Sequence, residues 1–281
     1  MWSIRLRGKR KLLRKDSRGL SPAISTVIMT AAIIVLVLVA MSYGQRYLAS
    51  SIAQNEFSTN QQFMLTTGLQ IDNVAWMIDR AQTIQYSSTY GSLEALPNAL
   101  TYTITVNNVV WRTFHTGIIL YNVPTTEYSL GKNYLSVLSQ GNREFLQNGS
   151  AAPDTCVYAI EKLPMSDGNF ARIVIVPTIR MMNTVVGSQN YVQFYLPLLT
   201  NGTSPGLSQS VTLICRNVDQ DVTAGVTTVS ITASFPLASK GFDSSFFPFK
   251  TMTETRTFIG PNLPTLELYN GTVSVSIGLY A

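Results

Sequence analysis

The fold of this chain is decided by residues Arg14–Arg46, RKDSRGLSPAISTVIMTAAIIVLVLVAMSYGQR. Beyond its basic start, this stretch carries no charged residue until Arg46, and apolar residues occur on every side of the helix that it would form. From Pro22 to Tyr43 it has about 22 residues, which as an α-helix measure about 33 Å and exceed a hydrocarbon core of about 30 Å. Ser21 and Pro22 are typical of a helix start, because serine caps free N–H groups and an initial proline loses none. The sequence therefore predicts a helix that lies in lipid or inside a helical bundle.

The junction between the basic residues and the apolar run carries a family resemblance. Residues 18–28, RGLSPAISTVI, resemble the class III signal of archaeal type IV pilins, a leader type that archaellins share. The resemblance covers the chain up to about residue 60, and Ile24 stands where bacterial pilins have a glutamate. It implies that a prepilin peptidase cleaves between Gly19 and Leu20, on the cytoplasmic side. The processing residues are then Arg18, Gly19, Leu20, Ser21 and Pro22.

The resemblance also implies what the apolar helix does after cleavage. In this family, copies of the chain assemble into a filament whose core consists of such helices, and a pilus assembly machinery builds it. Apolar side chains lose little when they move from lipid to protein, so side-chain packing and the machinery decide the outcome. The contacts of the polymer core would come from Val27, Ile28, Ile33, Ile34, Leu36, Leu38 and Met41.

The charges are distributed unevenly along the chain. The net charge is +5, but eight of the 20 Lys and Arg residues precede the apolar run, and with Asp16 they give that segment +7. The remainder therefore carries −2 and has no evident basic patch, which argues against nucleic acid as a partner. A basic block beside a membrane span stays cytoplasmic, so we expect everything after Arg46 to lie outside the cell.

The sequence predicts four segments: a leader of residues 1–19, a membrane or filament-core helix of residues 20–45, a helical continuation and connection of residues 46–98, and an extracellular β-rich domain of residues 99–281. The predicted fold class is α+β, with a long N-terminal hydrophobic helix followed by an antiparallel β-sandwich-like domain.

The third segment contains two predicted interruptions. Thr66–Gly68 predicts a break in the helix, because glycine and β-branched residues cost helix stability. The apolar spacing of residues 74–84 predicts that an amphipathic helix resumes there. Residues 86–98 contain Ser, Gly and Pro and read as the connection into the β-rich domain.

Beyond this connection the apolar residues alternate, which is typical of strands. Thr101–Val106 alternates, and Asn107-Asn108 offers a turn directly after it. Asn270-Gly271 predicts a two-residue hairpin between Thr265–Tyr269 and Val273–Tyr280. Further runs of this kind are Gly117–Val123, Arg172–Ile179, Tyr191–Leu199, Gln209–Cys215 and Thr227–Phe235.

Residues that carry catalysis are scarce. His115 is the only histidine, which excludes a histidine-based triad and a site built from several histidines. The chain has no phosphate-binding glycine loop, no dinucleotide fingerprint and no nucleophile elbow. Asn217–Thr223 alternates oxygen-bearing residues but lacks the glycine and the glutamate of a calcium loop, so a turn between strands is favoured. We therefore expect no enzyme, no cofactor and no metal site.

Two cysteines and three sequons follow the apolar run. Cys156 and Cys215 either form one disulfide or are two buried free thiols in separate strands, and the sequence leaves both alternatives open. Asn148, Asn201 and Asn270 each begin an Asn-Gly-Ser/Thr triplet. Such a triplet suits N-glycosylation of an exported loop, and it equally suits an ordinary turn.

Two functions from different classes fit these observations. The first is a structural subunit of an archaeal surface filament, anchored in the cell membrane before assembly, with the β-rich domain outside for adhesion or cell contact. Its partners would be other copies of the chain, the prepilin peptidase and the assembly machinery. The second is a membrane-anchored extracellular binding module that keeps the helix as a permanent anchor and does not polymerise.

Overall fold

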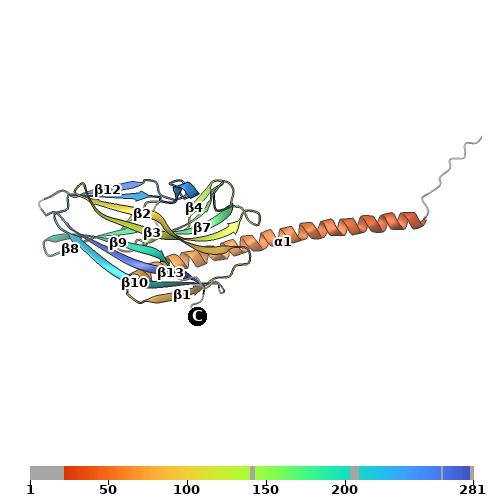
Figure 1. Ribbon diagram of the computed structural model, residues 1–281, viewed down its shortest axis with the longest axis horizontal. Helices are drawn as coiled ribbons and strands as arrows, with labels where there is room; N and C mark the ends of the chain where they lie inside the picture. Colours follow the sequence, from red (N-terminus) through yellow and green to blue (C-terminus); the bar gives the residue numbers. More distant parts are fainter. Residues whose placement is uncertain (1–21, 140–142, 203–208, 261, 279–281) are drawn as a thin grey trace, which may run out of the picture. The chain divides into compact units, whose positions relative to one another are not determined.

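A computed structural model of the chain describes residues 22–139, 143–202, 209–260 and 262–278. One long helix, α1 (Pro22–Ala75), precedes a strand-rich region (Figure 1). The chain divides into two compact units, one ending at Leu48 and one from Ala49 onward, and each is described by itself. The predicted α+β class, with a long apolar N-terminal helix and a β-rich domain, is confirmed.

The first unit consists of the apolar part of α1. Pro22, where the sequence predicts the helix to start, is the first described residue and already belongs to α1. Every side chain from Ile24 to Leu48 is exposed, and the first charged residue in this part is Arg46. This part is long and apolar enough to cross a membrane.

The described residues of the second unit form thirteen strands, arranged in two sheets. Their bounds are β1 (Ala81–Gln85), β2 (Ser92–Val106), β3 (Val109–Pro124), β4 (Tyr134–Val137), β5 (Leu146–Asn148), β6 (Thr155–Glu161), β7 (Phe170–Pro177), β8 (Ile179–Val186), β9 (Gln189–Asn201), β10 (Ser210–Thr223), β11 (Thr228–Ser234), β12 (Thr253–Thr257) and β13 (Thr265–Ile277). One sheet has the order β1-β10-β13-β9-β8-β5, and the other has the order β12-β11-β2-β3-β7-β6-β4. The pairing is antiparallel except between β13 and β9 and between β5 and β8, which are parallel.

The Ala49–Ala75 part of α1 lies between the two sheets, as Figure 1 shows. Its buried residues, among them Phe57, Met64 and Ile71, form a helix cluster with side chains from both sheets. The seven-stranded sheet supplies alternate residues to two cores, since Ile119 belongs to the helix cluster and Leu120 to a sandwich cluster on the opposite face. The seven-stranded sheet is thus covered on both faces, and the Ala49–Ala75 part of α1 is buried inside the domain.

The predicted break at Thr66–Gly68 is wrong, because α1 continues through it to Ala75. A Cβ on Gly68 would lie 3.0 Å from side-chain atoms of both Thr155 and Val157, so glycine lets the helix approach β6 closely. The Thr155 hydroxyl also donates to the Gly68 carbonyl at 3.1 Å. Packing on the sheet therefore outweighs the low helix propensity of this segment.

The predicted second helix over residues 74–84 and the predicted connection over residues 86–98 are wrong as well. The helix ends at Ala75, and Ala81–Gln85 is β1, which pairs with β10. β2 begins at Ser92, inside the predicted connection. In a segment this short, the spacing of apolar residues does not distinguish a helix from an edge strand. Pairing with β10 determines that residues 81–85 form a strand.

The predicted strands are largely confirmed, with one correction at Asn270-Gly271. The turn at Asn107-Asn108 is present, with positive φ angles of 49° and 65° between β2 and β3. β13, however, runs without interruption through Asn270 and Gly271 between β10 and β9. A Cβ on Gly271 would overlap the carbonyl oxygen of Ala75, so this glycine makes room for the end of α1 rather than for a hairpin.

Candidate functional site

The first candidate site is the exposed apolar part of α1. The residues predicted for polymer-core contacts all lie in it and are between 55 % and 69 % exposed: Val27, Ile28, Ile33, Ile34, Leu36, Leu38 and Met41. An apolar surface of this size marks an interaction site with lipid or protein. Of the predicted processing residues, Pro22 is the first residue of α1, and Arg18, Gly19, Leu20 and Ser21 lie outside the described residues.

The second candidate site is the clamp that holds α1 in the domain at Glu56. Both carboxylate oxygens accept hydrogen bonds from the loop between β1 and β2: the backbone N–H of Thr89 donates at 2.8 Å, that of Tyr90 at 3.1 Å and that of Gly91 at 2.9 Å. The Tyr121 hydroxyl of β3 donates at 2.5 Å. A Cβ on Gly91 would overlap the end of the Tyr121 side chain, so a larger residue there would have to displace Tyr121.

The electrostatics of this clamp favour the charged carboxylate. Burial by itself would raise the pKa of Glu56, but hydrogen bonds from Ser88, Tyr121 and two backbone N–H groups lower the pKa to about 2. A negative charge on the helix is thus held by donors from strand β3 and from the loop between β1 and β2. Glu56 lies in a polar stretch of the sequence, and no pattern there reveals this role.

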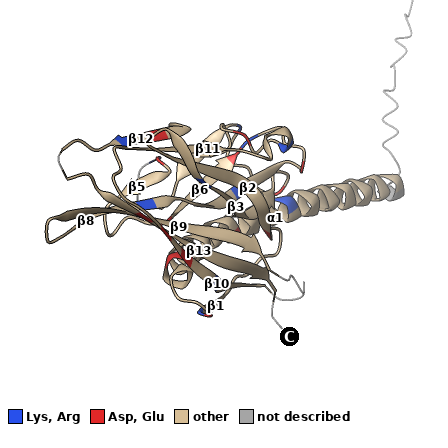
Figure 2. Cartoon of the chain, turned by 60° about the vertical axis from the view of Figure 1, so that its left-hand side comes forward, with Lys and Arg blue, Asp and Glu red and all other residues tan. Residues whose placement is uncertain are grey.

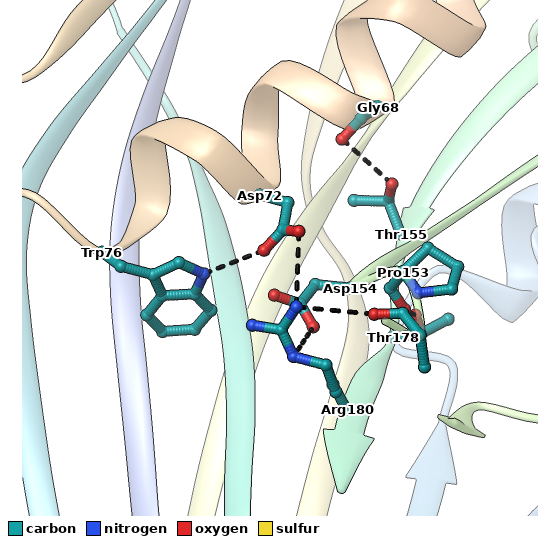
Figure 3. A network of polar contacts seen from close by, with 9 residues as sticks. Gly68, Asp72, Trp76, Pro153, Asp154, Thr155, Thr178 and Arg180 are labelled. Atoms are coloured by element: carbon teal, nitrogen blue, oxygen red, sulfur yellow. Dashed lines mark hydrogen bonds and ion pairs between the residues drawn. The ribbon is translucent and has the colours of Figure 1, made fainter. Parts of the chain in front are cut away.

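The third candidate site is a polar network at the C-terminal end of α1, shown in Figure 3. The Trp76 indole N–H donates to one Asp72 oxygen at 3.0 Å, and Arg180 Nη1 of β8 lies 3.4 Å from the other. Arg180 Nε lies 3.2 Å from a carboxylate oxygen of Asp154, whose side chain is fully buried. The guanidinium group also stacks over the Tyr195 ring, with 5.0 Å between its carbon and the ring centroid.

The two carboxyl groups of this network titrate in opposite directions. Burial raises the pKa of Asp154, and the hydrogen bond and negative charge of Asp72 raise it further. For Asp72, burial acts in the same direction, but hydrogen bonds from Asp154 and Trp76 and the charge of Arg180 outweigh it and lower the pKa. The pair therefore shares one proton, held by Asp154 and donated to Asp72, beside a single cation.

A cleft of about 860 Å³ opens beside this network. One wall is the exposed side of α1, including Leu65, Leu69 and Asp72, and the other is formed by residues 147–153 together with Arg180. The lining mixes apolar, amide and hydroxyl groups with these two charged residues. Such a lining suits the binding of a polar ligand or chain segment, and it includes no histidine or cysteine for nucleophilic chemistry.

The alternative of a disulfide between Cys156 and Cys215 is not realised, because both are free and buried. Cys156 lies on β6 in the sandwich cluster, whereas Cys215 lies on β10 in the helix cluster, where its thiol donates to the Ala75 carbonyl at 3.3 Å. The two cysteine side chains therefore lie in different cores. The alternative of two separate buried thiols is therefore the correct one.

The three sequons differ in accessibility. Asn148 and Asn201 are exposed at the ends of β5 and β9, so N-glycosylation there stays a prediction. Asn270 is only 5 % exposed within β13. The prediction that Asn270 is a glycosylation site is wrong, because this residue is buried within β13 between the neighbouring strands β10 and β9.

The remaining polar candidates have structural contacts. Asn217–Thr223 is part of β10 rather than the predicted turn, and Asp221 forms an ion pair with Arg112 of β3. The exposed His115 shares a hydrogen bond of 2.9 Å with the Thr101 hydroxyl on the neighbouring strand. Among the described residues, no group of three His, Cys, Asp or Glu side chains could hold a metal ion.

No known protein family, curated protein or solved structure matches this chain.

Proposed function

We propose that the chain is a structural subunit of an archaeal type IV pilus-like surface filament. The observation that carries this proposal is that all side chains from Ile24 to Leu48 are exposed, while no charge interrupts the run before Arg46. A helix of this kind is stable only where lipid or other apolar helices cover it. The membrane covers it before assembly, and copies of the same helix cover it in the filament.

The way that the domain holds α1 supports the same proposal. In the second unit the helix is fixed by the helix cluster, by five donors on Glu56 and by the ion pair of Asp72 with Arg180. A subunit of a filament needs such a connection, because force on the polymer core must reach the outer domain without extracting the helix. The outer domain then forms the filament surface that meets cells or other substrates.

A second function, the membrane-anchored extracellular binding module, is favoured by one specific observation. The cleft beside Asp72 and Arg180 is large enough for a small polar ligand. In this alternative the helix remains in the membrane, and copies of the chain do not polymerise.

The N-terminal residue of the exported protein distinguishes these functions. Processing by a prepilin peptidase leaves Leu20 first, and an uncleaved anchor leaves Met1. Cleavage by an ordinary signal peptidase after Ala40-Met41-Ser42 would leave Tyr43 first and remove the apolar helix. A protein that begins at Tyr43 would exclude both functions.

Filaments isolated from cells then separate the subunit from the module. We expect the chain to be their main component, and we expect Gly19→Phe to abolish both cleavage and filaments. Gly44→Ala is the control, because a Cβ at Gly44 meets no atom within 4 Å. Protein that begins at Leu20 yet is found only as membrane-held monomers would contradict the filament proposal and favour the binding module.

A further inference from the structure

Strand β12 is an edge of the seven-stranded sheet that the described chain leaves unpaired on one side. It consists of Thr253–Thr257, TETRT, and it pairs only with β11. Figure 2 shows it at the margin of the domain. An edge strand presents a row of free N–H and C=O groups, and natural proteins usually cover such an edge or protect it with proline, lysine or inward-pointing charges. β12 has no lysine or proline, and its two inward-pointing charges, on Glu254 and Arg256, are of opposite sign.

The hydrogen bonds that flank β12 show which backbone groups point outward. The Phe258 N–H donates to the Thr227 carbonyl, and the Ala233 N–H donates to the Met252 carbonyl, each at 2.8 Å. Because these groups alternate along an antiparallel pair, residues 254 and 256 bond to β11. The N–H and C=O groups of residues 253, 255 and 257 therefore point away from the sheet.

The side chains of β12 are sorted between two faces. Its threonines are exposed on the outer face, where Thr253 and Thr255 share hydrogen bonds of 3.2 and 3.1 Å with hydroxyl groups of β11. Glu254 and Arg256 lie on the inner face, and their nearest charged atoms are 3.7 Å apart. The Glu254 side chain is 9 % exposed and that of Arg256 is 36 % exposed. The outer face of β12 thus carries no charge that would repel an identical strand.

The sequence of β12 complements itself when two copies run antiparallel. If Thr255 lies opposite Thr255 of a second copy, Glu254 lies opposite Arg256 of that copy, and Arg256 lies opposite Glu254. In this register the outward N–H and C=O groups of residues 253, 255 and 257 face their counterparts. A shift of two residues either way places Glu254 opposite Glu254 or Arg256 opposite Arg256, so cross-strand charge selects the central register.

We propose that β12 is a docking edge for a second copy of this chain, which adds its own β12 antiparallel about Thr255 and joins two sheets into one. The recognition is by backbone hydrogen bonds with two symmetric Glu254–Arg256 pairs. A carboxylate already withdrawn from water, as Glu254 is, gains more from an arriving cation than an exposed one does.

The contact between two β12 strands is small, so it is effective only where copies of the chain are held close together. Five residues of strand bury far less than the roughly 800 Å² per partner of a stable interface. Between freely diffusing chains the pairing is therefore weak, and it becomes effective when a membrane or a polymer holds many copies close together. The proposal goes beyond the filament function and holds for an anchored monomer as well.

Cysteine cross-linking of the full chain in lipid vesicles tests the register. In the central register the two Thr255 Cα atoms are about 5.5 Å apart, which lies within the range for a disulfide. We expect Thr255→Cys to form a disulfide-linked dimer on mild oxidation. Thr232→Cys is the matched control. This exposed threonine of β11 pairs with Thr253, so it would lie three strand spacings across and four residues along from its counterpart, about 20 Å away. The wild-type chain measures how much cross-linking arises from the two native cysteines, Cys156 and Cys215, which are buried.

Charge variants in the Thr255→Cys background test the pairing itself. Arg256→Glu places like charges opposite each other, and we expect it to lower the cross-linked fraction about tenfold. Adding Glu254→Arg exchanges the two charges and should restore cross-linking, while circular dichroism verifies that each variant is folded. If Thr232→Cys cross-links as well as Thr255→Cys does, the chains meet through the helix or by random collision, and the proposal is overturned. A charge exchange that fails to restore cross-linking in folded protein also overturns the proposal.

Discussion

The proton shared by Asp72 and Asp154 should make the stability of the domain depend on pH in an unusual direction. Asp154 is fully buried and its pKa is raised above the ordinary 3.8, so the folded chain keeps a proton that the unfolded chain releases. The stability that this proton provides is complete below pH 3.8 and is lost as pH rises through the raised pKa. Asp72, whose pKa is lowered, has the opposite dependence, and its contribution falls only in acid.

Replacing Asp154 by asparagine removes this dependence. An asparagine amide can donate to Asp72 as the protonated carboxyl does, and it cannot ionise. One proton of difference between folded and unfolded chains gives a slope of at most about 1.4 kcal/mol per pH unit. Relative to Asp154→Asn, we therefore expect wild type to lose about 2 kcal/mol of unfolding free energy between about pH 6 and pH 8. At about pH 4 the two proteins should be similar in stability.

Denaturant unfolding of the full chain in detergent, followed by circular dichroism across this pH range, measures the difference. Asp79→Asn is the matched control, because Asp79 is exposed and its φ of 62° is one that asparagine also adopts. The control should follow the wild-type curve. If Asp154→Asn also runs parallel to wild type between pH 6 and pH 8, then Asp154 is ionised in the folded chain, and the assignment of the proton is refuted.

Single contacts give three further predictions. Glu56→Gln should lower the unfolding free energy at pH 7 by about 2 kcal/mol, because it removes the charge that the loop donors stabilise. Since the pKa of Glu56 is about 2, wild type should lose this contribution as pH falls from 4.5 through 2, and acid titration of both proteins tests this. Gly271→Ala should destabilise the domain by at least about 2 kcal/mol, because the Cβ of the alanine would overlap the Ala75 carbonyl. A thermal melt measures this, and an unchanged melting temperature would contradict the close packing of α1 on β13. Cys156 and Cys215 should resist alkylation in the native protein and react only after unfolding, since burial raises the pKa of both thiols, that of Cys156 to about 11; a disulfide-linked peptide pair in mass spectrometry would contradict their separation.

Properties that depend on neighbouring residues were predictable from the sequence. The apolar helix and its capacity to cross a membrane follow from composition and helix geometry alone. Alternating apolar residues revealed most strands, and Asn107-Asn108 revealed its turn because asparagine tolerates positive φ. In each case the interactions that decide the structure lie within a few residues of one another.

Properties that depend on distant residues were not predictable in this way. From their neighbouring residues, Gly68 predicts a helix break and Gly271 a hairpin turn. In the structure, α1 and a sheet approach each other at both positions too closely for a Cβ. Glu56 and Asp154 read as ordinary polar residues, yet distant strands and loops supply their donors and their burial. The TETRT strand became an edge only through the order of the sheet. The sequence by itself determined which segments are helix, strand and membrane-length apolar run, since local sterics and hydrophobic period decide them. Only the tertiary structure decided which charges are buried, which glycines are contact points and which strand is left open, because these depend on residues far apart in the chain.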